Sequence, residues 1–142
     1  MNRLSNMLAV TLPGLVLLTS CAKQRMIDRD ELRSDLTAGI SLGSESRLYL
    51  QQTVEGRTSQ SFSEGHLHYL AEEANRTERE LQQSVASSED VQTLNQSRLQ
   101  FEALSRELTV IGQKPSDQNA LVNSIRRLTE IGKAMEKTKS SL

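Results

Sequence analysis

Residues 117–139 read DQNALVNSIRRLTEIGKAMEKTK, and the spacing of apolar residues in this stretch decides the fold. The apolar residues recur every three or four positions, with polar and charged residues between them: Leu121, Ile125, Leu128, Ile131 and Met135. This period places them on one face of an α-helix. The stretch therefore predicts an amphipathic helix whose apolar stripe packs against a partner.

Three earlier stretches show the same period. Their stripes include Leu32, Leu36, Ile40, Leu50 and Val54; Leu67, Leu70, Ala74, Leu81 and Val85; and Val91, Leu94, Phe101, Leu104, Leu108 and Ile111. We predict four helices, each about 25 residues or roughly 37 Å long, over residues 29–55, 62–86, 88–112 and 117–139. Because the links are short, we expect an all-α fold, an antiparallel up-and-down four-helix bundle.

The predicted boundaries rest on capping signals. Asp28, Ser61 and Ser87 each stand three residues before an acid, which is the pattern of a helix start. Gly56 and Gly112 follow the first and third stripes, where glycine commonly ends a helix.

The link between the second and third helices is less sharply marked. Ser87-Ser88 contains neither Gly nor Pro, so the alternative is one fused rod in a long helical hairpin or coiled coil. The apolar phase slips by one residue between Leu81 and Leu94, which favours a turn.

Composition excludes several classes of function. The chain has 142 residues with 17 basic and 18 acidic side chains, and this balance argues against nucleic-acid binding, which needs a basic surplus. Aromatic residues make up only 3%, too few for base-stacking platforms or for the aromatic pockets of organic cofactors. The single cysteine excludes an intrachain disulfide framework. We expect no nucleic-acid partner and no cofactor.

The N-terminal segment differs from the rest of the chain. Arg3 is its only charged residue, and residues 8–18 form an uncharged apolar run. Eleven helical residues span roughly 16 Å, too short for about 30 Å of hydrocarbon. A basic start, a short apolar run and then small residues are typical of a secretory signal.

The sequence Leu18-Thr19-Ser20-Cys21 ends this segment and resembles the lipobox of bacterial lipoproteins, with the only cysteine of the chain at the required position. The resemblance implies cleavage after Ser20 and a diacylglyceryl group on Cys21. It divides the chain into a signal peptide over residues 1–20, a lipidated cysteine with a short tether over residues 21–28, and a helical domain over residues 29–142. Ala22 after the cysteine favours the outer membrane, facing the periplasm, over the inner membrane.

Two other interpretations of the N-terminus stay open. Ser20-Cys21-Ala22 also fits cleavage by an ordinary signal peptidase, which would release a secreted protein. Alternatively, Cys21 is a buried thiol placed there by chance.

One cluster in the predicted bundle has metal-ligand chemistry. Glu64, His68 and Glu72 are four residues apart and share a helix face, so carboxylates and an imidazole could meet a divalent transition metal there. His66 lies roughly 200° around the helix from His68, so the two histidines cannot chelate one ion. The competing interpretation is a pair of exposed histidines in surface ion pairs.

From these features we expect a non-enzymatic, lipid-anchored envelope protein. Its helical domain would contact an envelope partner or a second copy of itself, and the membrane would be bound through the lipid on Cys21. The alternative is a periplasmic sensor that binds a metal or small ligand through Glu64, His68 and Glu72.

Overall fold

The computed structural model describes residues 24–114 and 116–142. The elements of this part follow one another along the chain: β1 (Arg25–Met26), α1 (Arg29–Val54), α2 (Gln60–Gln83), β2 (Ser84–Val85), α3 (Val91–Gly112) and α4 (Gln118–Lys139). The predicted signal peptide and the lipobox cysteine, Cys21, lie outside the described residues.

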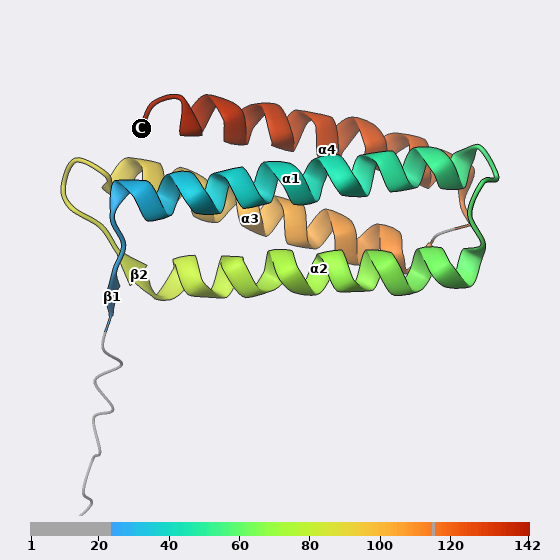
Figure 1. The fold of residues 1–142 in the computed structure, drawn as a ribbon, viewed down its shortest axis with the longest axis horizontal. Coiled ribbons are helices and arrows are strands. Elements are labelled where there is room, and N and C mark those ends of the chain that lie inside the picture. The colour runs from blue at the N-terminus through green and yellow to red at the C-terminus, as the bar shows by residue number, and fades with distance from the viewer. Residues whose placement is uncertain (1–23, 115) are drawn as a thin grey trace, which may run out of the picture.

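The four helices form an antiparallel bundle, which confirms the predicted fold class (Figure 1). Helix α1 packs mainly against α4, and α2 packs mainly against α3. Among helices that are neighbours in the bundle, α1 and α2 are the least closely packed. One end of the bundle carries β1, β2 and the C-terminus, and the opposite end carries the α1–α2 and α3–α4 links (Figure 1).

Helices α2 and α3 are separate, so the fused rod is excluded, but the link between them is longer than predicted. Helix α2 ends at Gln83 rather than residue 86, and α3 begins at Val91 rather than residue 88. The reason is a tertiary contact, because β2 pairs in parallel with β1. The backbone groups of Ser84 and Val85 therefore bond another segment instead of extending the helix.

The helix starts agree with the capping signals at α1 and differ at α2 and α3. Asp28 and Glu31 form a reciprocal capping box at the start of α1. Helix α2 is capped by Ser59, whose hydroxyl accepts from the Phe62 N–H, rather than by Ser61. Asp90 precedes α3 without capping it with its side chain, because its carboxylate accepts from Arg29 and from the Ser87 hydroxyl, to which the Asp90 N–H donates in turn.

The core consists mostly of leucines from the predicted stripes, and Phe101 and Met135 of the third and fourth stripes belong to it as well. Gly39 lets the side chains of Phe101 and Met135 pack directly against the backbone of α1. A Cβ atom built at Gly39 would lie 2.7 Å from Cζ of Phe101 and 2.9 Å from Sδ of Met135. The glycine thus makes room for the two largest side chains beside it. At the end of α1, Gly56 has a φ of 70°, which confirms the predicted stop.

The folded domain begins earlier than the predicted boundary at residue 29. Ile27 is only 2% exposed and belongs to the core, and its N–H donates to the Val85 carbonyl at 2.8 Å. Residues 25–28, which were expected to belong to a tether, are instead packed on the bundle. The reason is that strand pairing and the Asp28 cap fix their backbone.

Candidate functional site

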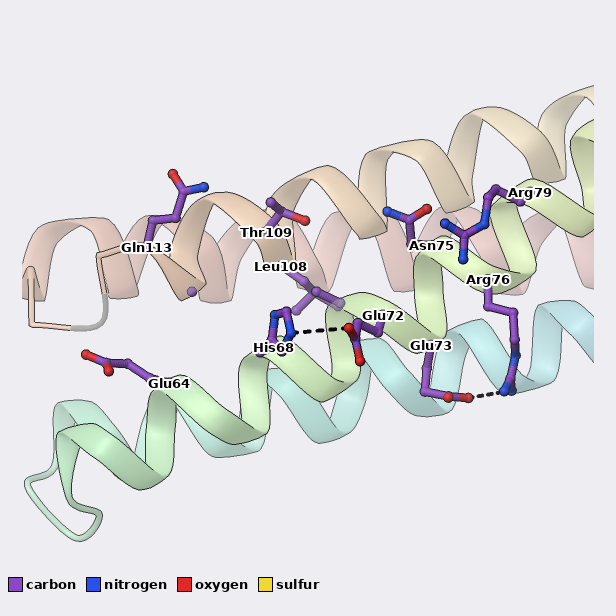
Figure 2. A pocket seen from close by; sticks show the side chains of 12 residues that line it. Glu64, His68, Glu72, Glu73, Asn75, Arg76, Arg79, Leu108, Thr109 and Gln113 are labelled. Carbon is purple, nitrogen blue, oxygen red and sulfur yellow. Dashed lines mark hydrogen bonds and ion pairs between the residues drawn. The ribbon is translucent and has the colours of Figure 1, made fainter.

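The three predicted metal ligands lie in one groove between α2 and α3. This groove has a volume of about 680 Å³, and Glu64, His68 and Glu72 all line it (Figure 2). Leu108 of α3 and Ala71 of α2 form apolar parts of its wall. The helical spacing of four residues therefore does place the three side chains on a common surface, as expected.

Within the groove, the side chains of His68 and Glu72 are in contact. Nε2 of His68 lies 3.2 Å from Oε1 of Glu72, and both side chains are largely exposed. Glu64 lies one turn earlier on α2, and its carboxylate points away from His68 (Figure 2). In residues 24–114 and 116–142, no set of three or more His, Cys, Asp or Glu side chains is arranged to hold a metal ion.

The rest of the groove is polar and open to solvent. Arg76 pairs with Glu73 at 2.5 Å, and Asn75 and Arg79 line the part of the groove further along α2, while Thr109 lines it from α3 (Figure 2). Exposed pairs of this kind contribute about 0–1 kcal/mol to stability because water screens them. This arrangement can form hydrogen bonds with a polar ligand lying along the surface.

The other histidine, His66, occupies a different environment. Its Nε2 lies 3.0 Å from Oε1 of Glu45 on α1, and its side chain is only 27% exposed. Its ring centroid lies 4.5 Å from that of Tyr49 and 6.2 Å from that of Phe62, with which it stacks at an interplanar angle of 4°. Tyr69 is the fourth ring, 6.4 Å from His66. We call Tyr49, Phe62, His66 and Tyr69 the aromatic cluster.

Sequence reasoning missed the aromatic cluster. Its signal was present in part, since Phe62, His66 and Tyr69 are spaced by four and three residues on the predicted second helix. Tyr49 and Glu45 join them from α1. That contact depends on how α1 and α2 pack, which the helical period alone does not specify.

Burial and charge alter the pKa of two groups on the α1–α2 side. Burial raises the pKa of the Tyr49 hydroxyl, and the nearby Ser63 hydroxyl opposes the shift. The Tyr49 hydroxyl makes no hydrogen bond of standard geometry among the described residues. Near β1, partial burial raises the pKa of Asp35, and the neighbouring Glu80 and Glu31 carboxylates add to the effect while Arg25 opposes it. The α1–α2 side therefore contains a poorly bonded buried hydroxyl, that of Tyr49, and a carboxyl group whose ionised form is disfavoured, that of Asp35.

At the same end of the bundle, Glu31 shows the opposite shift. The guanidinium of Arg25 donates to its carboxylate at 2.6 Å, and the backbone N–H of Asp28 donates to it as well. These two interactions hold the pKa of Glu31 below its ordinary value. The capping box is therefore strongest when Glu31 is ionised.

Comparisons of the chain with protein-family models, with curated proteins and with solved structures found no match. None of the helices in the described residues combines the length and the apolar character needed to cross a bilayer.

Proposed function

We propose that this protein is a non-enzymatic contact module of the bacterial cell envelope, anchored by lipid on Cys21. The observation that carries the proposal is the sequence Leu18-Thr19-Ser20-Cys21, which resembles a lipobox and contains the only cysteine of the chain. Two or three acyl chains hold a protein on a membrane, whereas one alone binds marginally. The lipid on Cys21 would therefore be sufficient as the only anchor.

The fold supports a short attachment at one end. Only residues 22–24 separate Cys21 from β1, and three extended residues reach about 10 Å. Strand β1 lies at the end of the bundle opposite the α1–α2 link (Figure 1). An anchor on Cys21 would thus keep the β1 end close to the lipid headgroups and present the far end about 40 Å away, the length of α1.

The net charge of the chain after cleavage also supports a lipid anchor. Removing residues 1–20 takes away Arg3 and no acidic side chain, so the remaining chain has a surplus of acids. An acidic domain gains no attraction from an anionic leaflet. Ala22 after the cysteine favours the outer membrane, where the bundle would face the periplasm and contact an envelope protein or another copy.

Metabolic labelling tests the anchor. Cells that express the full chain are grown with labelled palmitate, and their membranes are separated from the released fraction. We expect label on the protein and recovery with membranes, and we expect Cys21→Ser to lose both. An unlabelled wild-type chain found in the released fraction would reject the anchor, and the intact mass of its N-terminal peptide would identify the cleavage that occurred.

A second proposal is a periplasmic binder of a metal or small ligand. Its support is that Glu64, His68 and Glu72 line the same groove. Calorimetric titration of the protein with zinc, copper and nickel tests it. Micromolar binding that is lost in His68→Ala but kept in His66→Ala would favour this function, and the absence of binding heat with all three metals would reject a metal ligand.

A further inference from the structure

The aromatic cluster gathers nearly all of the aromatic surface of this chain. The sequence contains two tyrosines and two phenylalanines, and three of these four residues belong to the cluster. Phe62 and Tyr69 are 62% and 54% exposed, although both lie against other rings. Large aromatic side chains that stay exposed side by side are typical of protein contact surfaces.

The exposed rings stand on a fixed base. Tyr49 is only 8% exposed, and its ring lies against both Phe62 and His66. His66 is held in turn by Glu45 of α1. Because these contacts already restrict the rings, ordering them in a complex costs little conformational entropy.

The charges around the rings are paired within the chain. Glu45 pairs with His66, Glu73 pairs with Arg76, and Glu55 pairs with Arg57 at the α1–α2 link. The surface therefore combines an aromatic centre with pairs of acidic and basic side chains at its edge. A second copy of the same surface matches this distribution, because its centre is equally apolar and its edge supplies both signs of charge.

We propose that the aromatic cluster is the surface through which two copies of this chain pair side by side on the membrane. The proposal rests on the anchor at Cys21. The cluster lies toward the α1–α2 link, because Tyr49 is near the end of α1 and Phe62 near the start of α2, and this link is at the end of the bundle opposite β1 (Figure 1). Two anchored copies with their β1 ends at the same membrane would therefore hold their clusters at equal height. A two-fold axis along the bundles then brings each cluster against its own copy, which is the usual symmetry of a homodimer.

The size of the surface makes the pairing depend on the anchor. A stable interface buries about 800 Å² on each partner, more than two exposed rings and their edge supply. Confinement to one membrane raises the effective concentration of the second copy. This increases the fraction of paired chains although the interface gains no new contacts. The pair therefore forms on the membrane and falls apart when the chain is released.

Cross-linking in membranes tests the pairing. The lipid blocks the Cys21 sulfur, so the thiol introduced by Tyr69→Cys is the only one that can react. Isolated membranes are treated with a short bismaleimide, which links two such thiols when they lie close together. We expect a covalent homodimer. Adding Phe62→Ser should lower its yield about tenfold, as removal of a central aromatic contact does. Val122→Cys on α4, where Val122 is 55% exposed, is the matched control and should remain monomeric.

The outcomes separate this surface from the anchor. A palmitate-labelled chain whose Tyr69→Cys variant stays monomeric, while thermal melting shows it to be folded, overturns the pairing and leaves the anchor. Equal dimer yields from Tyr69→Cys and Val122→Cys overturn the choice of surface. An adduct between Tyr69→Cys and a different protein overturns the second copy as occupant. A Tyr69→Cys dimer from an unlabelled chain overturns the anchor and the dependence of the pairing on it, and leaves only the choice of surface.

Discussion

The two ends of the bundle are held together by different interactions. At the β1 end, charged groups join separate elements: Arg29 donates to Asp90 through two nitrogens at 2.8 and 3.0 Å, and Arg98 donates to the carbonyls of Leu81 and Ser84. At the opposite end, the α1–α2 link is held by hydroxyl contacts among Thr53, Thr58 and Ser63 and by the aromatic cluster.

The difference shows where the fold depends on directional bonds. The β1 end has irregular backbone, since β1, β2 and the link to α3 meet there, and its polar groups need partners. Arginine side chains reach across elements and supply these partners. At the far end, α1 and α2 are joined by a short link that turns at Gly56, and ring packing and small hydroxyls connect these two helices, whereas Arg127 of α4 pairs with Glu107 of α3 at 2.7 Å. An anchor at Cys21 would be attached to the more heavily bonded end.

The largest expected effect comes from Ile27→Ala at the β1 end. Ile27 is 2% exposed and fills the core beside the strand pair, so truncation leaves a cavity and should cost about 2–5 kcal/mol in the free energy of unfolding. Met26→Ala is the matched control, because Met26 is 66% exposed. Urea unfolding measures both, and equal midpoints would mean that residues 25–28 are not part of the folded domain.

The next effect concerns the end of α2. Arg98→Ala removes the donor to the Leu81 and Ser84 carbonyls, which we expect to cost about 2 kcal/mol, as for other hydrogen bonds from charged groups. Arg126→Ala on α4 should change stability by less than about 0.5 kcal/mol, since its guanidinium makes one long contact of 3.5 Å to Asn123. Thermal unfolding that ranks the two variants equally would contradict this role for Arg98.

The contacts at the end of α2 also show which features of the fold the sequence could not predict. The apolar period predicted the bundle correctly, because stripes such as Leu121 to Met135 leave few ways to bury four amphipathic helices. The end of α2 was predicted three residues late, at residue 86, since nothing local announces that Ser84 and Val85 pair with a strand about 60 residues earlier.

The same distinction applies to the candidate sites. The common face of Glu64, His68 and Glu72 follows from helical spacing alone, and the three do line one groove. The spacing of Phe62, His66 and Tyr69 could indicate their common face on α2, but Tyr49 joins them from another helix, so no pattern within α2 could indicate the complete cluster. Side chains on one helix were predictable, whereas partners across helices were not.

A smaller effect is expected at the far end, where the buried hydroxyl of Tyr49 lies near Ser63 but makes no hydrogen bond of standard geometry among the described residues. Tyr49→Phe removes the hydroxyl and keeps the ring, so we expect a gain of about 1 kcal/mol, since an unsatisfied buried group is costly. Ser63→Ala, which removes a bonded hydroxyl nearby, should instead lower stability. A loss of stability in Tyr49→Phe, measured by urea unfolding, would show that the hydroxyl has a partner.

The smallest effect depends on pH and lies at the β1 end. The pKa of Asp35 is raised in the folded state above its unfolded value, which is near 3.8. Between these two pKa values, the folded protein binds more protons than the unfolded protein does. The free energy of unfolding therefore falls as pH rises through that range. Asp35→Asn removes this loss, so it should stabilise the protein at pH 7 by less than about 1 kcal/mol, because Asp35 is only half-buried.

The pH dependence of Asp35→Asn separates charge from packing. Its advantage over the wild type should vanish below the unfolded pKa, where Asp35 is protonated in both states. Asp30→Asn is the control on the same helix: its side chain is 91% exposed and pairs with Arg33, so removing its charge should give no gain at pH 7. Thermal melting from pH 3 to pH 7 distinguishes them, and a gain in Asp35→Asn that persists at pH 3 would assign its effect to packing rather than to the carboxylate.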